Sequence, residues 1–266
     1  MALYINTNIA SLNAQNNLAQ TQMNLTNTMA QLSSGLRINS AKDDAAGLAI
    51  ATRMQSQITG SNQAIRNSND AINQQQTADG ALANITTSLQ RMRELAVESA
   101  NGTLGTGDRS NLDAEFQQLA SEITRLGTDT KFNSQAVFGT TSTVYQIGAD
   151  SGQTITVSAI TAASISGDIT SVANANTALS AIDAQLTTVN TQRATLGAVE
   201  NRFQSVVTSL QTNVTNQTAS QASIMDTDFA AQTANMTKYQ ILNQAGTAML
   251  AQANSLPNSV LTLLKG

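Results

Sequence analysis

Charge is almost absent from both ends of this chain. Residues 1–36 contain no Asp, Glu, Lys or Arg, and residues 229–266 carry only Lys238 and Lys265. Both ends nevertheless space their larger apolar residues by three, four or seven, which places these residues on one side of a helix. An uncharged helix with a narrow apolar stripe has little core of its own, and isolated helices are marginal in water. The sequence therefore predicts two terminal helices that pair with each other and become ordered when neighbouring subunits bury them.

The predicted pairing residues are the larger apolar side chains on the two stripes. They are Leu18, Leu25, Met29, Leu32 and Leu36 in the N-terminal segment, and Leu242, Met249, Leu256, Val260 and Leu263 in the C-terminal segment. Gly246 and Ala253 fall on the same C-terminal stripe. Small residues at these positions allow another helix to approach closely.

A second pair of helices is predicted inside the first. Ser40, followed by Asp43 and Asp44, indicates a helix start with a hydroxyl cap and acidic residues in the first turn. Apolar residues continue at helical spacing to about residue 101, and a similar pattern beginning near residue 174 indicates the returning helix.

The connection between these long helices contains a shorter helix, predicted over residues 111–126. It also contains two alternating segments, 144–147 and 154–157, which predict a hairpin. The predicted fold is therefore mainly α: a long antiparallel helical bundle or coiled coil formed by the N- and C-terminal segments, with a small β-hairpin region at the tip.

Residue types that are missing exclude most catalytic chemistry. The chain has no His and no Cys, so it cannot form a Ser-His or Cys-His nucleophile pair, or a zinc site built on His or Cys ligands. A net charge of −4 disfavours binding to nucleic acid. The chain contains no run of 18 apolar residues, which is the length that a membrane-spanning helix needs. The first residues also lack the basic region of a cleavable secretory signal. We predict a protein without enzymatic activity, cofactor or metal, which does not insert into membranes.

Two motifs have an alternative chemical interpretation. The pairs Asp43–Asp44 and Asp226–Asp228 could form a metal or acid/base site, but carboxylates near a helix start more often cap the helix. The glycine-rich segment 102–107 could hold a phosphate, but it follows a helix instead of a strand and has no adjacent Lys, so a turn is favoured.

Four segments resemble the bacterial flagellin family. Residues 32–50 (LSSGLRINSAKDDAAGLAI) are similar to the N-terminal flagellin signature, and residues 90–97 (QRMRELAV), 196–203 (LGAVENRF) and 240–254 (QILNQAGTAMLAQAN) match further family motifs. One departure is Met225, which stands where many relatives have an Arg, so an ion pair of that Arg is not carried over.

The resemblance implies a domain organisation and a function. Residues 1–42 and 224–266 would form the D0 coiled-coil domain, residues 43–223 the D1 domain with its hairpin around 144–157, and no D2 or D3 insertion would be present. The chain would be the subunit of an extracellular bacterial flagellar filament for swimming motility, secreted by the flagellar type III apparatus. Its partners would be other copies of itself, an export chaperone, and the hook–filament junction and cap proteins.

The resemblance also implies recognition by the vertebrate Toll-like receptor for flagellin. The matching residues are Arg91, Leu95 and Glu115, although spacing alone favours a solvated helix face for Arg91. Three alternative functions are a flagellin-like hook–filament junction protein, a flagellin with an inserted metalloprotease and a cytosolic coiled-coil scaffold. The metalloprotease would require His, which the chain lacks, and the scaffold would require charged flanking positions, which the ends lack.

Overall fold

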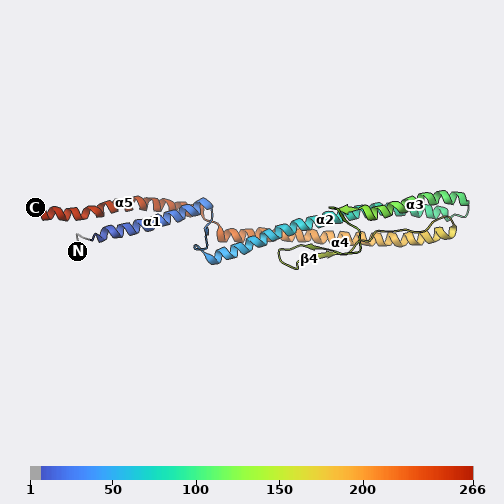
Figure 1. Cartoon of the computed structure of the whole chain (residues 1–266), viewed down its shortest axis with the longest axis horizontal. Helices are drawn as coiled ribbons and strands as arrows, with labels where there is room; N and C mark the ends of the chain where they lie inside the picture. Colours follow the sequence, from blue (N-terminus) through green and yellow to red (C-terminus); the bar gives the residue numbers. More distant parts are fainter. Residues whose placement is uncertain (1–6, 266) are drawn as a thin grey trace. The chain divides into compact units, whose positions relative to one another are not determined.

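The computed structural model describes the backbone of residues 7–265 and the side chains of residues 7–256, so the predicted pairing residues Val260 and Leu263 lie outside the described side chains. Within this range the predicted mainly α fold is confirmed (Figure 1). The elements in chain order are α1 (Ile9–Ser34), α2 (Ala45–Ser99), α3 (Thr106–Asp129), β1 (Lys131–Phe132), β2 (Gln135–Ala136), β3 (Thr143–Gln146), β4 (Thr154–Val157), α4 (Val172–Met225) and α5 (Phe229–Lys265).

The chain divides into two compact units. Unit 1 combines residues 1–55 with 217–266, and unit 2 consists of residues 56–216. The boundaries of these units fall inside α2 and α4. The D0–D1 division, with its boundaries at residues 42/43 and 223/224, stays a prediction.

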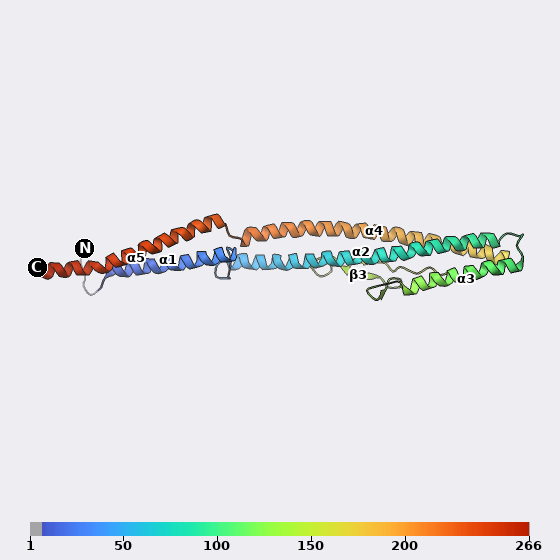
Figure 2. The ribbon, with the colours of Figure 1, turned by 90° about the horizontal axis from the view of Figure 1, so that it is seen from above.

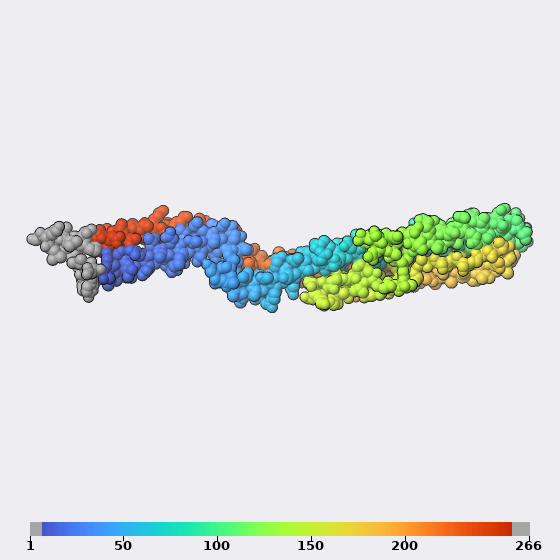
Figure 3. Space-filling model, viewed as in Figure 1, coloured from blue at the N-terminus to red at the C-terminus, as the bar shows by residue number. Residues whose placement is uncertain are grey.

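In unit 1, α1 and α5 lie side by side and run in opposite directions (Figures 1 and 3). Asn8 caps α1, because its side-chain oxygen accepts a hydrogen bond from the backbone N–H of Ser11. Gly35 ends α1 with a φ of 72°, a left-handed conformation that glycine adopts without steric cost. Asp228 caps α5 by accepting from the N–H groups of Ala230 and Ala231, as its predicted structural role requires.

The cap of α2 differs from the prediction. Asp44, and not Ser40, caps the helix, since its Oδ1 accepts from the N–H of Gly47 at 2.8 Å. Ser40 donates its hydroxyl to Asp43 at 2.9 Å in the turn that precedes the helix. A carboxylate directly before the first helical residue reaches the unpaired N–H groups better than a hydroxyl four residues earlier.

The core of unit 2 lies where α2, α3 and α4 run side by side (Figure 2). It is built from apolar side chains that recur at helical spacing on all three helices: Leu82, Ile85, Leu89, Met92 and Leu95 on α2, Phe116 and Ile123 on α3, and Ile182, Val189 and Leu196 on α4. Helix α3 extends beyond the predicted 111–126. The segment between α2 and α3, which contains Gly102 and Gly105, forms a turn as predicted, but the predicted turn segment 102–107 is too long because Thr106 and Gly107 already belong to α3.

The predicted hairpin is the antiparallel pair β3–β4, in which Val144 lies opposite Thr156 and Tyr145 opposite Ile155. Its inward residues Ile155 and Val157 cover Ala71 and Phe203, so the hairpin packs beside the middle of α2 and α4 instead of at their ends. The apolar surface that the hairpin must bury is found there. The segment that contains it lies on the outside of unit 2 (Figure 3). A second, two-residue pair, β1–β2, was not predicted.

Candidate functional site

The pairing stripes of α1 and α5 are only partly covered in the single chain. Leu18, Leu25 and Leu32 on α1 are half-buried and Met29 is exposed, as are Leu242, Met249 and Leu256 on α5. Leu36 is half-buried but lies beyond the end of α1, because Gly35 stops the helix in a left-handed conformation, so the predicted place of Leu36 on the helical stripe is wrong. Among the described side chains of this helix pair, the buried ones are small or polar, namely Ser11, Thr28 and Ala253. The two helices approach closely, and many of their large apolar side chains still stay exposed.

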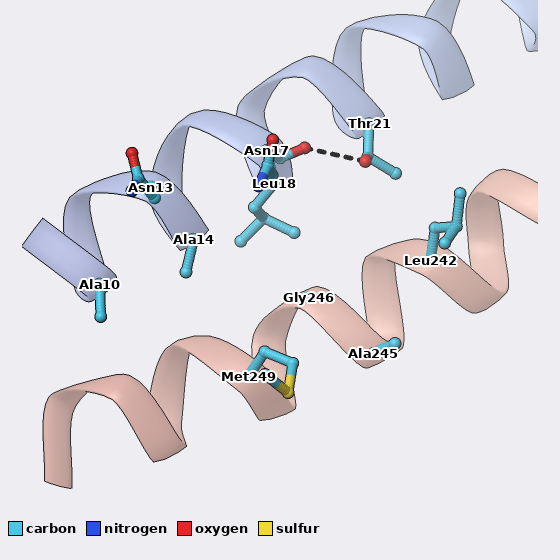
Figure 4. Close-up of a pocket in the computed structure, with 10 residues that line it drawn as sticks. All are labelled: Ala10, Asn13, Ala14, Asn17, Leu18, Thr21, Leu242, Ala245, Gly246 and Met249. Atoms are coloured by element: carbon cyan, nitrogen blue, oxygen red, sulfur yellow. Dashed lines mark hydrogen bonds between the residues drawn. The ribbon is translucent and has the colours of Figure 1, made fainter. Parts of the chain in front are cut away.

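A groove of about 410 Å³ lies between α1 and α5 (Figure 4). The side chains of Ala14 and Leu18 point from α1 toward α5, and Leu242 points back toward α1. Gly246 lies opposite Leu18, and a Cβ added to this glycine would be 3.1 Å from Leu18 Cδ1. The absence of a side chain at residue 246 therefore sets how closely the two helices meet.

Polar side chains join the two helices at both ends of the pair, which the sequence analysis missed. Asn8 donates its side-chain amide to the carbonyl of Ala253 at 2.8 Å, and Ser11 donates its hydroxyl to Asn254 Oδ1 at 2.7 Å. At the other end, the amide of Gln232 donates to Gln31 Oε1 at 2.8 Å. The high Asn and Gln content of both termini was the available signal, but it does not identify the partners.

The outer surface of the α1–α5 pair carries large apolar side chains among polar ones and has almost no charge. The exposed fraction is 54% for Leu12, 54% for Met23, 60% for Ile241 and 64% for Met249. Scattered apolar residues are normal on a protein surface, but this set lies on two helices in which Lys238 is the only charged residue among the described side chains. Such a surface is suited to being covered by another protein surface.

Hydrogen bonds join the segment that follows α1, residues 35–37, to the segment between α4 and α5, residues 224–227. The N–H of Arg37 donates to the carbonyl of Met225 at 2.6 Å, and the N–H of Thr227 donates to the carbonyl of Gly35 at 3.0 Å. The Arg37 guanidinium also donates to the carbonyl of Ile224 at 2.7 Å. These bonds hold the start of α5 beside the end of α1.

The three residues of the predicted receptor site lie together in unit 2 but differ in exposure. Arg91 on α2 donates through Nε to Glu115 Oε1 on α3 at 2.8 Å, and its Nη1 lies 3.0 Å from Glu94 Oε2. This hydrogen-bonded pair lowers the pKa of Glu115 and raises that of Arg91, so both stay charged. Leu95 has 0% exposure and belongs to the core, so its side chain is not part of the surface.

The described residues contain no group of three or more acidic side chains close enough together to hold a metal ion. Asp43 and Asp228 are engaged in turn and cap hydrogen bonds, which accounts for their position without catalysis. None of the helices, over the described residues, is long and apolar enough to span a membrane.

Known proteins of one family match this chain over almost its whole length. Residues 5–143 match the bacterial flagellin N-terminal helical region, and residues 179–264 match the C-terminal helical region. The chain is 45% identical to a flagellin of Halalkalibacterium halodurans, an alignment that covers 99% of this chain and 100% of that protein. It is 37% identical to a flagellar filament 33 kDa core protein of Treponema phagedenis, over 99% of this chain and 100% of that protein.

A solved structure is similar as well. The crystal structure of Bacillus cereus flagellin superposes with a TM-score of 0.50 at 31% identity, covering 59% of this chain and 94% of that chain. The two helical regions of the family therefore account for the long helices at both ends of the sequence, and the chain belongs to the bacterial flagellin family.

Proposed function

We propose that this chain is the structural subunit of an extracellular bacterial flagellar filament and that its own function is polymerisation for swimming motility. Flagellins are structural filament proteins and not enzymes. The observation that carries the proposal is the α1–α5 pair, whose large apolar side chains, such as Ile241 and Met249, stay exposed in the single chain. Neighbouring copies would remove this surface from water, at about 25 cal/mol per Å² of apolar area.

The D0 and D1 organisation belongs to this proposal. The α1–α5 helix pair would form D0, and the bundle of α2, α3 and α4 with its hairpin would form D1 without an outer insertion. Because charges would resist burial in a subunit contact, the lack of charge on α1 and on most of α5 supports this assignment.

Polymerisation of purified chain on filament seeds, followed by electron microscopy, tests the proposal. The double variant Ile241→Gln/Met249→Gln should raise the critical concentration for assembly, because both exposed residues become polar. The matched control Gln240→Ala/Gln244→Ala changes two exposed polar residues of the same helix and should assemble normally. Normal assembly after deletion of residues 1–36 would contradict the proposal.

Export through the flagellar type III apparatus, an export chaperone, and contacts with hook–filament junction and cap proteins complete the proposed assembly route. Family membership supports them. The alternative of a hook–filament junction protein makes a different prediction. Such a protein would stop at short assemblies on the hook, whereas a filament subunit extends seeds in proportion to the protein supplied.

A second proposed function is recognition by the vertebrate Toll-like receptor for flagellin. The ion pair between Arg91 and Glu115 supports it, since it joins two exposed side chains from α2 and α3 in one polar surface. Leu95 would act indirectly, by packing beneath α2 and holding Arg91 in place. Receptor signalling by monomer should fall for Arg91→Ala and stay unchanged for Arg125→Ala, which removes a similarly exposed arginine of α3. Equal potency of both variants would remove the assignment.

A further inference from the structure

The turn between α2 and α3 contains an Asn-Gly pair that occurs once in the sequence, at Asn101 and Gly102. Both residues are exposed and lie outside the helices. Asparagine followed by glycine is the pair most prone to lose the side-chain amide, because glycine has no Cβ to hinder attack by its backbone nitrogen. The structure adds three features that favour this reaction at Asn101.

The attacking nitrogen is not held by a hydrogen bond. Within residues 7–265, the N–H of Gly102 donates to no acceptor, whereas the N–H of Ser40, which follows another asparagine, donates to Asp43 at 2.9 Å. Asparagines inside the helices are followed by N–H groups that belong to the helical ladder. The Gly102 nitrogen is therefore available.

The side-chain oxygen of Asn101, on which negative charge would develop during the attack, already accepts a hydrogen bond. Asn101 Oδ1 accepts a hydrogen bond from the N–H of Thr103 at 3.2 Å. When the Gly102 nitrogen adds to Cγ of Asn101, negative charge develops on this oxygen, and a backbone donor aimed at it stabilises the tetrahedral intermediate.

The Arg109 guanidinium lies beside the group that becomes the free carboxylate when the product is isoaspartate. Arg109 has 9% exposure, forms no ion pair among the described residues, and donates through Nη2 to the main-chain carbonyl oxygen of Asn101 at 2.9 Å and through Nε to that of Ser99 at 2.8 Å. In isoaspartate the peptide bond passes through Cγ, and the former main-chain carbonyl becomes the free carboxylate. The carboxylate then forms on the group that the Arg109 guanidinium already binds.

We propose that Asn101 is a self-modification site that converts to isoaspartate, with Arg109 holding the new carboxylate. The deprotonated nitrogen of Gly102 bonds to Asn101 Cγ, the bond from Cγ to Nδ2 breaks, and ammonia leaves with a proton to give a cyclic succinimide. Water adds to one succinimide carbonyl and opens the ring. Attack at the main-chain carbonyl gives isoaspartate, and attack at Cγ gives aspartate.

The test uses the full-length chain, folded and incubated at mildly alkaline pH, followed by trypsin digestion and mass spectrometry. Cleavage after Arg93 and Arg109 releases peptide 94–109, which contains Asn101 as its only asparagine. We expect this peptide to gain the mass difference between an amide and a carboxylate. We also expect a higher ratio of isoaspartate to aspartate than in the same sequence incubated as a free peptide, because only the folded chain places Arg109 there.

Gly102→Ala is the matched control. No atom lies within 4 Å of the added Cβ, and Gly102 is not among the glycines with a left-handed φ, so the variant should keep the fold and lose most of the conversion. Asn133, which precedes Ser134 in the exposed turn between β1 and β2, is an internal control that should convert more slowly.

Three results would overturn the proposal. They are conversion in Gly102→Ala at the wild-type rate, protection of Asn101 in the folded chain relative to the unfolded chain, and an unchanged product ratio between the folded chain and the free peptide. Circular dichroism of each variant establishes that the fold is kept, and none of these readouts depends on polymerisation.

Discussion

Gly246 on α5 faces Leu18 on α1 so closely that a Cβ on the glycine would lie 3.1 Å from the Leu18 Cδ1 atom. The terminal helices therefore meet through a position without a side chain. Replacement by a large residue should force them apart, at a cost of about 1–3 kcal/mol for overpacking. Gly246→Leu should raise the critical concentration for polymerisation.

Gly246→Ala is the control for this prediction. Leu18 lines an open groove and its terminal methyl group can rotate away, while alanine favours the helix over glycine by up to about 1 kcal/mol. Assembly of this variant should stay near that of wild type. Failure of both variants would show that the glycine is required for a reason other than helix spacing.

Phe203 anchors the hairpin to the helices of unit 2. Its ring is fully buried and makes an edge-to-face contact with Tyr145 at 5.5 Å between centroids. Phe203→Ala should lower the free energy of unfolding by about 3–5 kcal/mol, because it removes a core aromatic and leaves a cavity. Thermal unfolding followed by circular dichroism measures the loss. Phe203→Leu should recover much of it, and equal loss in both variants would contradict a packing role.

Arg109 holds the end of α2 by donating to the carbonyls of Ser99 and Asn101. Arg109→Ala should destabilise unit 2 by about 2–3 kcal/mol, since a buried acceptor loses its charged donor. Urea unfolding measures this value. Arg125→Ala is the comparison, because its ion pair with Glu122 is exposed and contributes at most about 1 kcal/mol. A similar loss of stability in Arg109→Ala and Arg125→Ala would argue against a stabilising role for the hydrogen bonds from Arg109 to Ser99 and Asn101.

The hydrogen bond from Arg91 holds the pKa of Glu115 below that of an ordinary glutamate. Because the folded-state pKa is the lower one, the stability from this pair is present above the unfolded-state pKa and is lost as the pH falls through the folded-state pKa. Arg91→Ala should raise the pKa of Glu115 toward its ordinary value, which carboxyl NMR titration measures. An unchanged titration would mean that the pair does not persist in solution.

Much of this fold follows from local patterns in the sequence. Helical spacing from Leu82 to Leu95 and from Ile182 to Leu196 predicts α2 and α4, because an apolar stripe with that period must be buried against another stripe. Alternation in Thr154–Val157 predicts β4 in the same way. The family motif at residues 90–97 contains Arg91 and Leu95, so the resemblance predicts these two receptor residues without a structure, whereas Glu115 lies outside this motif.

Other features depend on which surfaces meet. The apolar stripe predicted that Leu95 is buried, whereas the family motif grouped it with Arg91 as a receptor residue, and packing in unit 2 buries Leu95 and leaves Arg91 exposed. The hairpin was expected at the tip and lies beside Ala71 and Phe203, where the helices offer apolar surface. Ser40 was predicted to cap α2, but its hydroxyl donates to Asp43 in the preceding turn, and Asp44 caps the helix instead.

The sequence by itself determined that the ends are amphipathic helices with almost no charge, that no chemistry based on His or Cys is possible, and that the family is flagellin, because each of these depends on residue identity and short-range spacing. The tertiary structure alone decided that Gly246 meets Leu18, that Asn8 and Ser11 bind residues near the far end of the chain, and that Arg109 reaches the carbonyl of Asn101. These contacts join side chains to partners on other elements, and which element packs against which is set by the burial of whole surfaces.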